Sequence, residues 1–206
     1  MDYHLTPDVH ACNSGDLIIF LDLGKDRYFA SPRRSLEFDP CARSIRLRDE
    51  GERCWTERLV QQGLVQATVP APRELLTSTV ALILPRSVAF TSALLWAGQA
   101  LDRPLALRRA LTALRRSREL SSRNREKAAT EAALFASWRP LWPRAFVCLH
   151  DTLALARYLS ARGSACDVVF GVQGRPFAAH CWAEFEGAVL NDEPEYCSSF
   201  DVILRT

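Results

Sequence analysis

The sequence lacks the features that mark a secreted or membrane-spanning chain. It begins with no basic-plus-apolar signal segment, and its most apolar stretch, residues 79–101, is interrupted by Pro85, Arg86, Ser87 and Gln99. We therefore expect neither secretion nor membrane insertion. The 7 cysteines are an odd number without a short-repeat framework, which predicts reduced thiols in a cytoplasmic protein instead of disulfides.

Motifs for metals and nucleotides are also missing. No C-x2-C or H-x3-H pair occurs, although cysteines and histidines gather in the last third of the chain, so we expect no metal. No G-x4-G-K-[ST] loop is present, so the sequence does not support ATP binding by this chain. We expect no cofactor.

The chain is long enough for an ordinary core. Its 206 residues are 48% hydrophobic, which suits one domain of moderate size or two small ones, and we favour two. A boundary is expected near Pro70, where Pro70-Ala-Pro-Arg is stiff and poor in backbone donors.

A cysteine stands at the predicted start of a helix. Cys148 follows Pro143 and precedes Leu149, Leu153, Ala156 and Leu159, which recur at helical spacing. Free N–H groups and the positive end of the helix dipole favour the thiolate and can hold an oxyanion there. Cys148 is therefore our candidate nucleophile.

A histidine and an aspartate follow in a context predicted to be strands. Residues 166–192 read as three short strands with turns at 174–176 and 186–187, and His180 falls on the middle strand. His180 can take the thiol proton of Cys148, and Asp192 can fix the imidazole tautomer. Each residue alone also fits a bland role, as a buried thiol, a satisfied histidine or a turn aspartate. Asn191 and Glu193 remain alternatives for the third position.

These residues lie within motifs that resemble a known family. Cys148-Leu-His-Asp-Thr-Leu-Ala-Leu, Phe170-Gly-Val, Pro176-Phe-Ala-Ala-His-Cys-Trp and Val189-Leu-Asn-Asp look like the leader peptidase (B protein) of lasso-peptide biosynthesis, a transglutaminase-like cysteine protease. The resemblance covers roughly residues 125–206 and implies a Cys148–His180–Asp192 triad. It also implies two partners, a precursor-peptide leader and an ATP-dependent macrolactam synthetase (the lasso cyclase), through which any ATP dependence would arise. Thr152 stands where the pattern suggests Ser, and we expect no functional consequence.

The first seventy residues form a different unit. Strands are expected over 2–11, 15–22 and 26–31, followed by a helix over 51–63 that Gly63 ends. The pattern resembles the winged-helix recognition element of peptide-modification pathways, in which a leader adds as a strand to the third strand and packs against the last helix. Our candidate leader contacts are Tyr28, Phe29 and Ala30 on that strand and Arg53, Arg58 and Gln61 on that helix.

An arginine-rich segment supports a second class of function. Nine basic residues stand between Arg103 and Lys127, against Glu119 and Glu126. A winged-helix start followed by such a segment would suit a nucleic-acid-binding regulator. Leucines at helical spacing in the same segment favour an ordinary solvated face, and the net charge is only +2. We therefore expect no nucleic-acid partner.

The sequence thus predicts a cytoplasmic α+β protein. Residues 1–70 are expected to form a small winged-helix-like domain that recognises a leader peptide, residues 71–124 a helical connector, and residues 125–206 a papain/transglutaminase-like cysteine protease domain.

Overall fold

The computed structural model describes residues 2–34, 36–47, 53–68, 85–102, 106–119, 121 and 124–206. The strands are β1 (Asp2–Leu5), β2 (Val9–Ser14), β3 (Leu17–Asp22), β4 (Arg27–Pro32), β5 (Leu36–Asp39), β6 (Ser44–Leu47), β7 (Val65–Gln66), β8 (Asp167–Gln173), β9 (Ala178–Phe185), β10 (Ala188–Val189) and β11 (Asp201–Arg205). The helices are α1 (Arg53–Gln61), α2 (Arg86–Leu101), α3 (Ala106–Glu119), α4 (Arg125–Trp138), α5 (Cys148–Ala161) and α6 (Pro194–Cys197), with a 3₁₀ turn at Arg139–Leu141.

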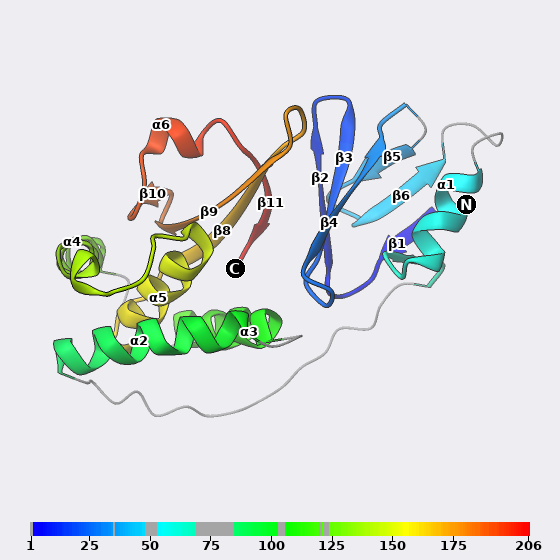
Figure 1. The fold of residues 1–206 in the computed structure, drawn as a ribbon. Coiled ribbons are helices and arrows are strands. Elements are labelled where there is room, and N and C mark those ends of the chain that lie inside the picture. The colour runs from blue at the N-terminus through cyan, green and yellow to red at the C-terminus, as the bar shows by residue number, and fades with distance from the viewer. Residues whose placement is uncertain are drawn as a thin grey trace.

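Three antiparallel sheets organise these elements. Their strand orders are β10-β9-β8-β11, β2-β3-β4 and β5-β6-β1-β7. In Figure 1 the three-stranded sheet stands beside β11, and α5 lies between α2 and the β8–β9 hairpin. The mixture of helices and sheets agrees with the expected α+β class.

The N-terminal half contains more strands than expected. The first predicted strand is divided into β1 and β2, because Pro7 lies in the turn between them and has no N–H for a ladder bond. The β3–β4 hairpin forms as predicted, and a second hairpin, β5–β6, follows it. Residues 2–68, where described, hold seven strands and one helix. A winged helix is built mainly from helices, so that part of the prediction is not confirmed.

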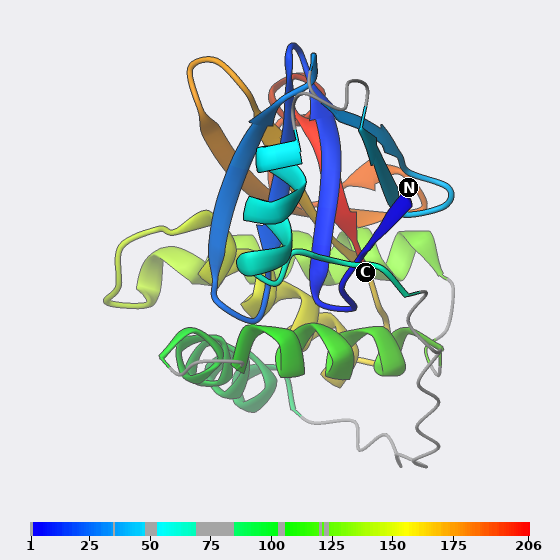
Figure 2. The ribbon, with the colours of Figure 1, turned by 90° about the vertical axis from the view of Figure 1, so that its right-hand side faces the viewer.

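The two faces of the three-stranded sheet pack into different cores. Ile18, Phe20 and Phe29 join one hydrophobic cluster together with Trp55 and Leu59 of α1. Side chains of the opposite face, among them Ile19, Leu21 and Tyr28, pack into a larger cluster with α2, α3, α5, β8 and β9. Figure 2 shows α1 on the side of the molecule turned toward the viewer, in front of these strands. One core therefore contains side chains from both halves of the chain.

The predicted boundaries remain predictions. Pro70 and the rest of the expected linker lie outside the described residues, as do Arg103 and Arg123 of the arginine-rich segment. Helices α2 and α3 fall within residues 71–124, the segment expected to be helical. No helix in the described parts of the chain is long and apolar enough to cross a membrane.

Helix α3 is anchored on both sides. Its apolar face, with Leu107, Leu111 and Leu114, is buried in the large core. On its polar face, Arg108 Nε lies 2.7 Å from Asp8 Oδ1, and Arg118 forms an ion pair with Asp167. Two of the arginines that suggested a nucleic-acid surface therefore have acidic partners within the protein.

Candidate active site

Cys148 is the first residue of α5, as predicted. Val147, the residue before it, provides no side-chain cap, so backbone N–H groups of the first helical turn remain available to a ligand. The Cys148 thiol is exposed. Its place at the positive end of a 14-residue helix is suited to stabilising an adjacent oxyanion.

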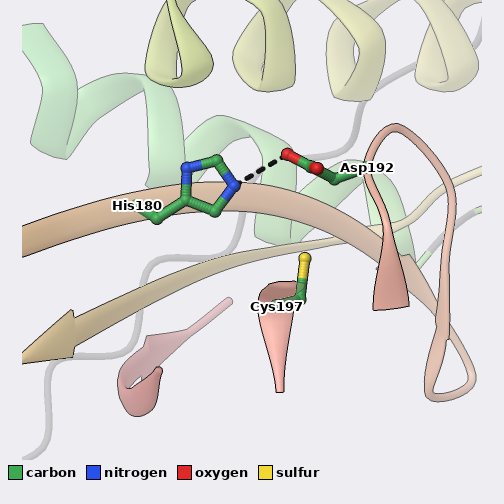
Figure 3. Close-up of side chains that lie close together, drawn as sticks. All are labelled: His180, Asp192 and Cys197. Carbon is green, nitrogen blue, oxygen red and sulfur yellow. Dashed lines mark hydrogen bonds and ion pairs between the residues drawn. The ribbon is translucent and has the colours of Figure 1, made fainter. Parts of the chain in front are cut away.

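His180 lies on β9 and is bonded to Asp192. The imidazole Nε2 and the Asp192 Oδ2 are 2.8 Å apart, as Figure 3 shows. Because this bond uses Nε2, Nδ1 is the nitrogen left to exchange a proton with a substrate or a thiol. The Asp192 side chain also accepts a bond from the Glu193 backbone N–H at 2.8 Å, which fixes the carboxylate from a second direction.

Aromatic side chains enclose the His180 ring. The ring centroid lies 5.8 Å from that of Trp182, 5.1 Å from that of Tyr196 and 5.4 Å from that of Phe200. Gly171 is the cross-strand partner of His180, and a Cβ there would lie 2.6 Å from Phe200 Cβ. A glycine is therefore needed for Phe200 to pack beside the imidazole.

Thr152 connects the helix of Cys148 to the strand of His180. Its hydroxyl donates to the carbonyl of Cys181 at 3.0 Å and accepts from Asn191 Nδ2, also at 3.0 Å. Asn191 Oδ1 in turn accepts from the Ala183 N–H at 2.7 Å. The start of α5, the middle of β9 and the segment before Asp192 therefore meet at one point, although no hydrogen bond joins Cys148 to His180 among the described residues.

Cys197 is a thiol that lies near the imidazole. Its sulfur and the ligand atoms of His180 and Asp192 lie within 4.8 Å of one another (Figure 3). Burial, and then the charges of Asp192 and Glu184, raise the pKa of Cys197 to about 11. A thiol whose pKa is raised in this way is a weaker nucleophile at neutral pH. Cys148 remains the better candidate for nucleophilic attack.

A buried ion pair holds the segment that precedes Cys148. Arg139 is 3% exposed, and its Nε lies 2.7 Å from Asp151 Oδ1. The same guanidinium donates to the carbonyls of Arg144 and Ala145 at 3.0–3.2 Å. Asp151 Oδ2 accepts from the Val147 N–H at 3.1 Å. These bonds fix the course of the chain up to the residue before the candidate nucleophile.

The candidate leader contacts divide between two faces. Phe29 points toward α1, where Arg58 and Gln61 are exposed, and Ala30 is exposed on β4. Tyr28 points the other way, and its ring centroid lies 5.5 Å from that of Phe177 in the β8–β9 turn. Arg53 is the first residue of α1, and its side chain lies outside the described part of the structure.

The electrostatic environment of Tyr28 includes two cysteines from the region of the candidate active site. Its pKa is raised, first by burial and then by the charges of Cys181, Asp26 and Cys148. Cys148 opens α5, and Cys181 follows His180 on β9. A residue expected to contact the leader is thus also influenced by the candidate nucleophile.

Sequence reasoning missed Thr152 and underused Asn191. Thr152 was expected to have no consequence, and Asn191 was considered only as a substitute for Asp192. The available signal was positional: Thr152 stands one helical turn after Cys148, and Asn191 stands directly before Asp192.

Comparisons with known proteins agree with this geometry. Residues 88–205, more than half of the chain, match the family described as the transglutaminase-like superfamily. The Microcin J25-processing protein McjB of Escherichia coli is 39% identical over 56 residues, which are 27% of this chain and 27% of that relative. The chain therefore matches about a quarter of the length of this curated relative. No solved structure matches.

Proposed function

The chain belongs to the transglutaminase-like superfamily, and from this premise we propose that it is a cysteine peptidase that removes the leader of a ribosomally made precursor during lasso-peptide maturation. The observation that carries the proposal is the His180–Asp192 pair, held beside the helix that Cys148 begins. The partial similarity to a microcin-processing protein and the motifs around Cys148 and His180 support the same substrate class.

The proposed reaction uses the three residues in sequence. His180 takes the thiol proton of Cys148, and the thiolate attacks the carbonyl carbon of the leader–core peptide bond. Backbone N–H groups at the start of α5 stabilise the oxyanion. His180 returns the proton to the leaving amine of the core, which leaves the leader as a thioester on Cys148. Water that gives a proton to His180 then attacks the thioester and releases the leader carboxylate.

The leader is proposed to bind along β4. This strand is at one edge of the three-stranded sheet. Its hydrogen bonds with β3 indicate which backbone groups of β4 point to the open edge. The Arg33 N–H bonds the Asp16 carbonyl at 2.8 Å, and in a regular antiparallel ladder bonded pairs alternate. The backbone N–H and carbonyl of Phe29 then bond the backbone of Phe20 on β3. The backbone polar groups of Tyr28, Ala30 and Pro32 instead point to the open edge of the sheet. Pro32, which has no N–H, suits that edge.

A leader strand at this edge would contact α1 on one face and the β8–β9 turn on the other. Side chains on one face of the added strand would lie toward α1, with Arg58 and Gln61, and those on the other face toward Tyr28 and Phe177. We propose that the second face directs the scissile bond to Cys148, so binding on β4 would raise the local concentration of that bond there. The released core is proposed to pass to the lasso cyclase, the partner that would supply any ATP dependence.

Two Ala30 variants test the binding mode. Ala30→Pro removes an outward N–H from β4, whereas Ala30→Val keeps it and suits a strand. Loss of one main-chain bond, with the restriction that proline adds, should weaken binding of a labelled leader about tenfold. Fluorescence anisotropy with the full chain measures the affinity, and mass spectrometry follows cleavage of a leader–core peptide. Equal affinities of the two variants would refute docking on β4, and a purified chain that never cleaves cognate leader–core peptides, even with the cyclase and ATP, would refute the peptidase.

A further inference from the structure

The Thr152 hydroxyl is buried and hydrogen-bonded both as a donor and as an acceptor. The side chain is 0% exposed, and the hydroxyl makes one bond as a donor, to the Cys181 carbonyl, and one as an acceptor, from Asn191. A buried threonine in a helix usually bonds the carbonyl one turn back along its own helix. Thr152 instead reaches two segments far away in the chain.

Each of the three segments carries one member of the proposed triad. Thr152 lies one turn after Cys148 on α5, Cys181 directly follows His180, and Asn191 directly precedes Asp192. We infer that Thr152 and Asn191 are positioning residues that align Cys148, His180 and Asp192 through this hydrogen-bonded junction. The inference rests on the proposed peptidase function.

The junction is well placed to control alignment because Asp192 lies outside regular structure. Residues 190–193 follow the two-residue strand β10 and precede α6, so no extended ladder fixes them. The Leu190 N–H bonds the Ala183 carbonyl at 2.9 Å, and the Asn191 side chain then ties the segment to both β9 and α5. Without the Thr152 hydroxyl, Asn191 keeps only its bond from Ala183. The segment that carries Asp192 is then no longer hydrogen-bonded to α5.

Displacement of this kind affects turnover more than binding. A shift of about 1 Å in reacting groups can cost about a hundredfold in rate, because the near-attack geometry is lost. The Thr152 hydroxyl is buried and bonds protein groups as both donor and acceptor, so it is not available to a leader bound on β4. Loss of the junction should therefore lower kcat with little change in KM.

Isosteric variants provide the test. Thr152→Val removes the hydroxyl at nearly constant shape, whereas Thr152→Ser keeps a hydroxyl. Asn191→Ala removes the amide that bonds this hydroxyl, and folding should tolerate the change because Asn191 is exposed. Thr112→Val is the matched control, because the Thr112 hydroxyl bonds the Arg108 carbonyl of its own helix, at 2.9 Å. Thr152→Val and Asn191→Ala should each lower kcat about 10- to 100-fold with KM within about threefold, whereas Thr152→Ser and Thr112→Val stay within about threefold of the unmodified protein.

A second readout does not depend on a peptide substrate. The rate at which iodoacetamide alkylates Cys148, followed peptide by peptide with mass spectrometry across pH, reports the alignment of Cys148 with His180. The profiles of Thr152→Val and Asn191→Ala should differ from that of the unmodified protein, and Thr152→Ser should keep the original profile. If Thr152→Val fails to fold, Asn191→Ala decides. Unchanged alkylation profiles in the folded variants overturn the inference whether or not the chain cleaves a leader, whereas shifted profiles without peptide cleavage count against the proposed substrate alone.

Discussion

Replacing Arg139 by Met should destabilise the protein and disturb the approach to Cys148. The guanidinium is buried, lies 2.7 Å from Asp151 Oδ1 and donates to two backbone carbonyls, of Arg144 and Ala145. Met fills a similar length of core but supplies none of these donors. The variant therefore leaves the Asp151 carboxylate and both carbonyls without the partner that holds them.

The size of the effect follows from burial. Removing one partner of a buried ion pair typically costs 3–5 kcal/mol, and Asp151 keeps bonds from the Val147 N–H and the His150 ring, so we expect about 3 kcal/mol. For a chain of this length, each kcal/mol lowers Tm by roughly 2–4 °C, so the melting temperature should fall by roughly 6–12 °C.

Thermal unfolding followed by circular dichroism measures this loss, and Arg157→Met is the matched control. Arg157 is exposed, and its main recorded contact is with the Trp96 ring, 5.6 Å from the centroid, which is worth about 0.5–1 kcal/mol. Arg139→Met combined with Asp151→Asn should cost less than the sum of the single variants, because the second change removes the charge that the first left unpaired. Equal losses for Arg139→Met and Arg157→Met would refute the reasoning.

Two further predictions concern packing and pH. Gly171→Ala should lower kcat for leader cleavage at least about tenfold and cost about 1–3 kcal/mol of stability, because the new methyl group would displace Phe200 from the His180 ring, and steady-state kinetics with thermal unfolding test this. Burial lowers the pKa of half-buried His10 to about 4 from the ordinary value of 6.5, so the unfolded state binds more protons between these pH values and stability falls as pH drops through this window. His10→Asn should reduce the loss of unfolding free energy between pH 7 and pH 4.5 by about 2 kcal/mol. Urea unfolding at both pH values measures this loss, and an equal loss in the variant and the unmodified protein would contradict the prediction.

The part of the site that follows from local sequence was predictable. The start of α5 at Cys148 follows from the apolar repeat after Pro143, and the β8–β9 hairpin follows from the turn residues around Gly174. Alternation along β9 puts His180 and Cys181 on opposite faces, and their neighbours agree: the His180 ring stacks on Trp182, whereas Cys181 belongs to the large core. The role of Asp192 as partner of His180 was an inference from order along the chain, and the 2.8 Å contact agrees with it.

The remaining features depend on contacts between distant segments. Thr152 and Asn191 are 39 positions apart, and neither residue has a local pattern that marks a polar junction. The β5–β6 hairpin was missed because its residues carry weak strand signals in an arginine-rich stretch. The orientation of Tyr28 toward Phe177 depends on how the three-stranded sheet packs against the C-terminal half, which periodicity along one strand cannot specify.

Comparing Cys148 with Cys197, the thiol near His180, tests the central claim most directly. Cys148→Ala should lower cleavage of a leader–core peptide by at least about a thousandfold, because the nucleophile is lost, whereas Cys197→Ala should keep activity within about tenfold of the unmodified protein. Both proteins should remain folded, as judged by circular dichroism, and liquid chromatography with mass spectrometry quantifies the leader and core products. Retained cleavage by Cys148→Ala, together with loss of cleavage by Cys197→Ala, would contradict the account and make Cys197 the nucleophile.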